Sequence, residues 1–262
     1  MDLQLAGKVV LVAGASAGIG AATARVLASE GARVALVSRS REKLDALLAE
    51  PVFAGRDGFA VAADLSTPAG CETAVAETLA HFGRIDGAVI SVGAAQGGPF
   101  EGLGDQVWEE AFALKFMGTV RVLRSLIAPM RAAGGGRVAV VVGNNGRQPN
   151  PLMLPGSAAN AACLAVVKGV AEAYAADNIH VNAINPGPTH TDRWTRLIDG
   201  IARETGRSHE DVHREQVARL PGGRLATAEE IGRLAALLVS DVSSVMNGTS
   251  ITADSGATKS LA

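Results

Sequence analysis

The chain has 262 residues, of which 48% are hydrophobic and 3% aromatic, with a net charge of −2 and a pI near 6.2. This length suits one α/β domain, and this apolar content supports a large core without disulfides or a structural metal. No basic stripe indicates nucleic-acid binding, and no block of like charges indicates a tail. Cys71 and Cys163 lie far apart without metal-ligand spacing, so we expect reduced structural thiols and no metal site.

The first eight residues, MDLQLAGK, lack the charged and apolar regions of a signal peptide. No apolar run approaches the roughly 18–20 residues that span a bilayer. Both observations favour a soluble, cytoplasmic protein that does not associate with a membrane.

Short apolar runs alternate with helix-length segments along the whole chain. We expect strands at 8–13, 33–38, 58–62, 85–91, 137–142, 179–184 and 248–253, and helices at 18–30, 40–49, 67–82, 105–133, 155–176 and 227–239. The strand segments are rich in Val, Ile and Ala and mostly lack alternation, which is typical of strands buried on both faces of a parallel sheet. Strand–helix alternation predicts a single α/β Rossmann-like doubly wound domain over 1–262, with a seven-stranded parallel sheet and helices on both faces.

Two segments depart from this regular alternation. The predicted helix 105–133 is long and carries apolar residues on more than one face, including Trp108, Phe112 and Phe116. One face can meet the sheet and another needs a partner, so we expect a homo-oligomer, most simply a tetramer. Residues 188–222 are polar, charged and weakly helical, and they form an insertion before the last helix.

A glycine-rich turn follows the first predicted strand. Residues 13–20 read AGASAGIG, so Gly14, Gly18 and Gly20 lie between that strand and the next helix. Glycines here allow a tight turn and a close approach of the backbone to a phosphate at the helix N-terminus. The strand before and the helix after this turn make it a specific signal for a dinucleotide-binding site.

Two blocks of sequence resemble the short-chain dehydrogenase/reductase (SDR) family. Residues 13–20 resemble the family's TGxxxGIG, and residues 182–191, NAINPGPTHT, resemble its VNxxxPGxxxT. The resemblance covers essentially the whole chain. It implies an oxidoreductase that binds NAD(P) and a small-molecule substrate, with a substrate lid at 188–222.

The resemblance also implies which residues contact the cofactor. These are Gly14, Ser16, Gly18, Ile19, Gly20, Ser38, Arg39, Asp64, Leu65, Ser91, Gly93, Pro186, Gly187 and Thr191. An acidic residue after the second strand would bind the ribose 2′-OH of NAD, whereas Arg39 can bind a 2′-phosphate through two N–H groups. We therefore expect NADP(H) in preference to NAD(H). Of the family's NNAG after the fourth strand, only Gly93 is kept.

All four positions of the family's catalytic tetrad are changed. Gly156 stands at the tyrosine position, Asn160 at the lysine, Gly143 at the serine and Lys115 at the asparagine. Gly156 offers no proton. The one tyrosine, Tyr174, lies about five turns further along the same predicted helix. The resemblance therefore predicts the scaffold but not the usual tyrosine mechanism.

Two of these changes are reciprocal. The family's lysine and asparagine positions carry Asn160 and Lys115 here, so the two residue types have exchanged places. In the family's fold these positions face each other beneath the nicotinamide ribose. The ammonium group would therefore come from the helix that carries the family's asparagine. Large apolar neighbours argue for burial of Lys115, and desolvation would lower its pKa. Asn144 and Asn145 follow the vacant serine position and could bind a substrate oxygen, although a polar loop tip explains them equally well. An exposed loop histidine explains His190 better than a general acid does.

Three functions remain open on the sequence. The first is an atypical oxidoreductase that takes its proton from Lys115, from water or from the substrate. The second is a non-redox lyase or isomerase that uses Lys115 as a base or amine nucleophile. The third is a catalytically silent subunit that supports a partner of the same family.

Overall fold

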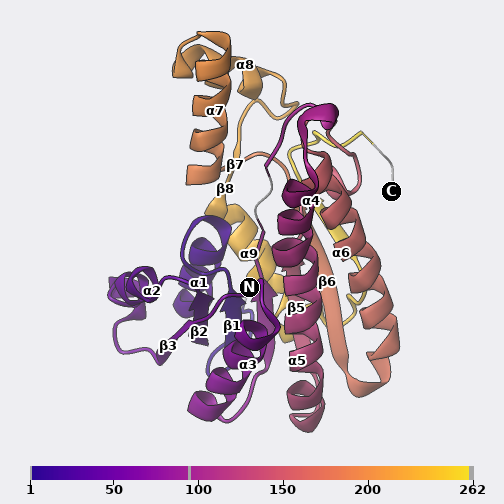
Figure 1. The fold of residues 1–262 in the computed structure, drawn as a ribbon. Helices are drawn as coiled ribbons and strands as arrows, with labels where there is room; N and C mark the ends of the chain where they lie inside the picture. Colours follow the sequence, from indigo (N-terminus) through magenta and orange to yellow (C-terminus); the bar gives the residue numbers. More distant parts are fainter. Residues whose placement is uncertain (1, 94–95, 260–262) are drawn as a thin grey trace.

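The computed structural model describes residues 2–93 and 96–259, and within them seven parallel strands form one sheet (Figure 1). The strand order is β3-β2-β1-β4-β5-β6-β9. The strands are β1 (Val9–Ala13), β2 (Arg33–Ser38), β3 (Gly58–Ala62), β4 (Gly87–Ile90), β5 (Gly136–Val141), β6 (Ile179–Pro186) and β9 (Ser250–Ala253). The predicted doubly wound α/β fold is confirmed. The order reverses between β1 and β4, and sheets of this kind bind ligands beyond the carboxyl ends of the strands at that point.

Helices cover both faces of the sheet. One face is covered by α3 (Pro68–Phe82), α5 (Gly118–Ala132) and α6 (Leu154–Ala173), and the other by α1 (Gly18–Ser29), α2 (Arg41–Leu48) and α9 (Ala228–Leu238) (Figure 1). Each face has its own hydrophobic cluster: Val122 and Val167 belong to the first, and Leu27 and Ala235 to the second. Burial of the strands between two helical layers explains their continuous apolar sequences.

Two predicted helix starts are confirmed. The Ser40 hydroxyl accepts a hydrogen bond from the backbone N–H of Lys43 at the start of α2. Thr227 and Glu230 form a reciprocal capping box at the start of α9. Both caps satisfy N–H groups that have no partner within the helix.

The segment predicted as one helix over 105–133 contains a change of helical type. It begins as α4 (Asp105–Ala111), passes through π-helical turns at Phe112–Met117 and continues as α5. A π-helical turn accommodates more residues than an α-turn and so rotates the side chains that follow it. Lys115 lies in these turns and is 8% exposed. Such turns are frequent at functional sites.

The 188–222 segment is more regular than its sequence suggested. It contains α7 (Asp192–Thr205) and α8 (His209–Ala218), which Figure 1 shows standing apart from the helical layers. A two-stranded sheet of β7 (Thr189–His190) and β8 (Ala226–Thr227) joins the segment to the domain. Buried Trp194, Ile198 and Val212 form a separate small cluster. This local packing stabilises two helices whose sequences are otherwise polar.

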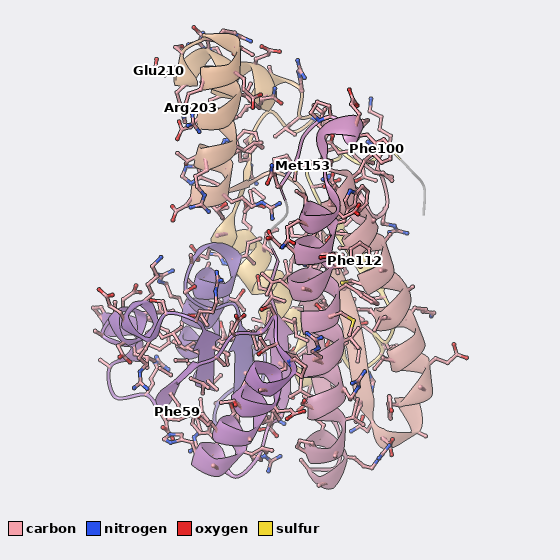
Figure 2. All side chains as sticks on the ribbon, viewed as in Figure 1. Phe59, Phe100, Phe112, Met153, Arg203 and Glu210 are labelled. Carbon is pink, nitrogen blue, oxygen red and sulfur yellow. The ribbon has the colours of Figure 1, made fainter. Side chains whose placement is uncertain are left out.

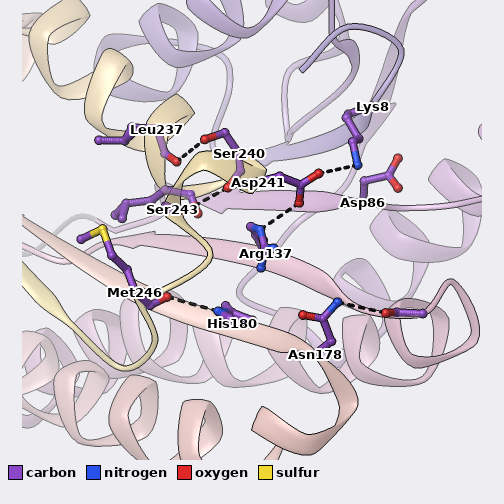
Figure 3. A network of polar contacts seen from close by, with 12 residues as sticks. Lys8, Asp86, Arg137, Asn178, His180, Leu237, Ser240, Asp241, Ser243 and Met246 are labelled. Carbon is purple, nitrogen blue, oxygen red and sulfur yellow. Dashed lines mark hydrogen bonds and ion pairs between the residues drawn. The ribbon is translucent and has the colours of Figure 1, made fainter. Parts of the chain in front are cut away.

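A polar network closes the amino-terminal end of the sheet (Figure 3). Asp241 accepts hydrogen bonds from Lys8 at 2.9 Å and from the buried Arg137 at 3.1 Å, and Asp86 accepts one from the backbone N–H of Val9 at 2.8 Å.

Short 3₁₀ turns lie between the longer elements, at Pro51–Phe53, Phe100–Gly102, Asn144–Gly146, Ala175–Asp177 and Asp241–Ser243.

One helix in the described part of the chain, α6, is long and apolar enough to cross a membrane by length and composition. In this fold it packs on the sheet, and Cys163, Val167 and Ala171 are buried in the core of that face. A third of its apolar window is buried in this fold.

Candidate functional site

The glycine-rich turn brings three backbone segments close together at the end of β1. Gly14 has a φ of +86°, and any side chain there would collide with the main-chain oxygen of Ser91. A side chain at Gly20 would collide with the carbonyl of Gly14. These positions therefore require glycine, and the turn leads directly into α1, as a phosphate-binding turn does.

The turn that follows β6 faces the same glycine-rich turn. The Thr191 methyl group lies 3.4 Å from the position that a β-carbon on Gly18 would take. Pro186 is buried at the end of β6, and Gly187 packs against Asp254. The two sequence blocks that carry the family resemblance therefore meet beyond the carboxyl ends of β1 and β6.

The end of β2 presents a free arginine. The Ser38 side chain is buried, whereas Arg39 is exposed and makes no ion pair with any described residue. Hydrogen bonds from Ser66, together with the charge of Arg39, hold the pKa of Asp64 below its usual range. Asp64 precedes the buried Leu65. An ionised Asp64 and an unpaired Arg39 thus border the adenosine end expected from the sequence.

Lys115 reaches from the π-helical turns to the ends of two strands. Its Nζ donates to the carbonyl of Val92, just beyond β4, at 3.0 Å and to the carbonyl of Val141, the last residue of β5, at 2.5 Å. Its aliphatic chain lies against Gly93, where a β-carbon would be 2.6 Å from Cδ. Two of the three N–H groups of the ammonium are therefore occupied by the protein, and one remains.

Burial changes the proton affinity of this lysine. Desolvation lowers the pKa of Lys115 to about 8, Cys163 acts in the opposite direction, and the positive charge of Arg193 lowers it further. Burial also raises the pKa of the Cys163 thiol, whose sulfur donates to the carbonyl of Lys115 at 3.5 Å. A lysine with this pKa is available as an acid or a base near neutral pH.

Three of the changed positions adjoin one another at the end of β5. Gly143 has a φ of +132°, and a β-carbon on it would lie 2.9 Å from Nδ2 of Asn160. Asn160 lies in the second turn of α6, and Gly156 lies in the first. Lys115 binds the carbonyl of Val141, two residues before Gly143. Lys115 and Asn160 therefore approach the same strand end from two different helices.

Asn144 is held by a residue that the sequence did not indicate. Its Nδ2 lies 3.4 Å from Oδ2 of Asp254, which also accepts from the backbone N–H of Thr258 at 2.7 Å. Asp254 is buried. Burial raises its pKa, but hydrogen bonds from Thr258, Asn144 and Gly256 outweigh that effect and lower the pKa overall. Only the fold could reveal this contact, because the two residues are 110 positions apart.

The remaining candidates are less constrained. Asn145 is half-buried in the 3₁₀ turn that follows β5, and His190 is exposed. Ser157 donates its hydroxyl to the carbonyl of Met153, one turn earlier in the chain, so this hydroxyl is engaged within its own helix. Phe100 is exposed, and its ring packs edge-on against Trp108 of α4 (Figure 2 labels Phe100).

The model of the short chain dehydrogenase family matches residues 8–201, which include both sequence blocks. The chain belongs to this family. It is 32% identical over its full length to the full length of the oxidoreductase YvrD of Bacillus subtilis. It is 33% identical to D-threitol dehydrogenase of Mycolicibacterium smegmatis, over 98% of this chain and 95% of that protein.

Solved structures give the same assignment. L-sorbose reductase of Gluconobacter frateurii, in complex with NADPH and L-sorbose, superposes with a TM-score of 0.94 over 100% of both chains, at 30% identity. The family assignment makes this chain an SDR-type oxidoreductase by descent, and the similarity extends over the whole fold.

Proposed function

We propose that this SDR protein binds NADP(H) in the crevice beyond β1 and β4 and acts as an oxidoreductase with a tyrosine-independent active site. The observation that carries the cofactor preference is the exposed, unpaired Arg39 at the end of β2. Its guanidinium is suited to a 2′-phosphate, which is absent from NAD. The NADPH bound to the related L-sorbose reductase supports the same choice.

The nicotinamide end of the cofactor would lie above the ends of β4 and β5. Pro186, Gly187 and Thr191 would hold the carboxamide, and Gly93 would pass beneath the ribose. The aliphatic chain of Lys115 packs against Gly93. Its ammonium group donates hydrogen bonds to the carbonyls of Val92 and Val141, at the ends of β4 and β5. When bound, NADPH supplies the hydride. The residues of the chain orient the substrate carbonyl and supply or direct its proton.

Lys115 is the titratable group best placed to act on that proton. Its remaining N–H can reach the ribose side of the site directly or through water, while its two carbonyl contacts keep it fixed. With a pKa of about 8, it is mainly protonated at pH 7 and can release a proton at modest cost. Asn160 and Asn144 would hold a substrate oxygen or a water molecule nearby.

The burial and low pKa of Lys115 also favour a second candidate. A lyase or isomerase would use the neutral amine of Lys115 as a base or nucleophile and would keep the cofactor, if bound, as a structural element. A silent subunit of a larger assembly is the third possibility from the sequence. The segment 188–222 would act as the substrate lid in the first two cases and would be dispensable in the third.

Transfer of deuterium from stereospecifically labelled NADPH to product distinguishes these functions. A panel of ketones, aldehydes and sugars, including L-sorbose, would be incubated with the protein and each labelled C4 epimer. We expect label in a product, with rates on simple ketones about 10²–10⁴-fold below those of tyrosine-dependent relatives, because the tyrosine acid of those relatives is missing. Product without label would identify the lyase or isomerase. Binding of NADPH without any product over the panel would favour the silent subunit.

A further inference from the structure

A hydrogen bond joins α7 to α8 at a buried tryptophan. Trp194 of α7 is 8% exposed and packs with Ile198 and Val212 in a cluster apart from the two clusters of the sheet. Its indole Nε1 donates to Nδ1 of His213 on α8 at 3.1 Å, and the two rings meet edge-on. An indole N–H can only donate, so Nδ1 of His213 accepts and the ring proton lies on Nε2. The contact therefore requires a neutral His213.

His209 lies one turn before His213 on α8 and has a different partner. The two imidazole rings are stacked, with 10° between their planes and 6.2 Å between their centroids. Nδ1 of His209 lies 2.7 Å from a carboxylate oxygen of Asp199 on α7. Among the described residues, no carboxylate lies within ion-pair distance of His213. A charge on His209 would therefore face a counter-charge, whereas a charge on His213 would face none.

The other charged groups near His213 do not supply that counter-charge. Within the described chain, Asp199 is the one charged side chain of α7 that bonds to α8. On α8 itself, Glu210 and Arg214 line an open groove of about 460 Å³ together with the two histidines. Glu210 is exposed, so water screens its charge. The remaining charges of α8 and of the turns that flank it are paired: Arg214 with Asp211, Arg207 and Arg219 with Glu215, and Arg224 with Glu230.

We infer that protonation of His213 in mild acid breaks its bond to Trp194 and opens the α7–α8 pair. The added proton takes the Nδ1 lone pair, so two N–H groups then face each other. The indole N–H is left in an apolar cluster without an acceptor, which is unfavourable until the helices separate and water reaches it. Once His209 is also protonated, two like charges are stacked 6.2 Å apart.

The small size of the lid cluster makes it sensitive to the loss of one contact. Its buried members are Trp194, Ile198 and Val212, whereas each face of the sheet has a far larger cluster. Opening requires neither NADP(H) nor a substrate. In the enzyme proposed above, the segment 188–222 is the substrate lid, so substrate access would depend on pH, and only that consequence rests on the proposed function.

The fluorescence of Trp194 reports this step directly. The chain has two tryptophans, so Trp108→Phe leaves Trp194 as the one that emits. In that background we expect a reversible shift of the emission maximum to longer wavelength between about pH 8 and pH 5, where histidine titrates, as the indole meets water. His213→Asn should remove the shift, because its amide oxygen can accept from Trp194 but does not titrate. His209→Asn is the matched control and should keep the shift. EDTA in every buffer prevents metal binding by the two histidines.

Hydrogen exchange tests the same step in the unaltered chain. After correction for the intrinsic effect of pH on exchange, we expect the exchange rates of the α7 and α8 amides to rise on acidification. The rise should be up to about 10-fold per pH unit across this range, because one proton is taken up on opening. The amides of α9, which packs on the sheet, should keep their protection.

A shift that is lost only with His213→Asn, together with faster exchange confined to α7 and α8, would support the inference. A constant emission maximum, or a shift that survives His213→Asn or disappears with His209→Asn, would overturn it. Loss of α9 protection at the same pH would indicate global unfolding and would also overturn it. Both measurements are made without cofactor, so their outcome is separate from that of the NADPH-binding and labelling experiments.

Discussion

Asn160 occupies the space above Gly143. Its Nδ2 lies 2.9 Å from the position of a β-carbon on Gly143, whose φ of +132° is also unfavourable for any residue with a side chain. The resemblance aligns residue 143 with the family's serine and residue 160 with its lysine, and on that alignment the two changes are coupled through space. Replacing either residue alone with its family counterpart would not restore the usual site.

The contact between Gly143 and Asn160 gives a first prediction. Gly143→Ser should destabilise the protein by about 1–3 kcal/mol, because it strains the backbone and displaces the amide of Asn160. Adding Asn160→Ala should relieve the collision but not the backbone strain. Urea unfolding of both single variants and the double variant should show a coupling energy of about 0.5–3 kcal/mol. Additive effects, within about 0.3–0.5 kcal/mol, would mean that the two residues do not compete for this space.

The exposed guanidinium of Arg39 gives a second prediction. Arg39→Ala should weaken NADPH binding by roughly 10- to 150-fold, corresponding to a charge-assisted contact of about 1.5–3 kcal/mol, and leave NADH binding nearly unchanged. Fluorescence titration with each cofactor measures both affinities. Arg41→Ala is the control, because Arg41 pairs with Asp45 on the outer side of α2. Equal affinities of the parent protein for NADPH and NADH would contradict the assignment.

The buried ammonium of Lys115 gives a third prediction, which concerns pH. Its pKa is about 8 in the folded chain and 10.5 ordinarily, so between these values the unfolded chain holds a proton that the folded chain has released. The free energy of unfolding contributed by this group therefore rises with pH across that window. At about 1.4 kcal/mol per pKa unit, the rise is about 3 kcal/mol.

Comparison of the parent protein with Lys115→Met isolates this contribution. We expect the parent to gain about 3 kcal/mol relative to Lys115→Met between pH 7.5 and 10.5, measured by urea unfolding. The exposed Lys43→Met serves as the control and should follow the parent. Lys115→Met should also abolish turnover and weaken NADPH binding while the fold persists. A pH-independent difference between the two proteins would show that the ammonium is not desolvated.

The π-helical turns between α4 and α5 give a fourth prediction. Phe112 and Phe116 are half-buried, and their rings lie 5.9 Å apart (Figure 2 labels Phe112). We predict a homotetramer in which this face meets its copy. Light scattering at micromolar concentration should give four times the chain mass of 26.6 kDa for the parent and a smaller species for Phe112→Asp. Leu197→Asp, an equally drastic change on α7, should leave the assembly intact. A monomeric parent protein would disprove the prediction.

Much of the fold follows from local sequence. Buried parallel strands need continuous Val, Ile and Ala, and the runs at β1, β2 and β5 show this without any knowledge of their partners. Gly14 and Gly20 are required by the backbone itself, so their spacing predicted the tight turn before the structure placed Ser91 against it. That Gly156, which has no side chain, stands at the family's tyrosine position is what the resemblance implies, and it stays a prediction.

The tertiary structure decided what replaces the missing groups. Lys115 was expected to be buried, but its bonds to Val92 and Val141 depend on π-helical turns that local propensity did not predict. The contact of Asn144 with Asp254 joins residues 110 positions apart. A pattern along the chain reports which residues are buried. The direction of a charged side chain within the site depends on desolvation and on partners from several elements, and those meet only when the whole sheet has assembled.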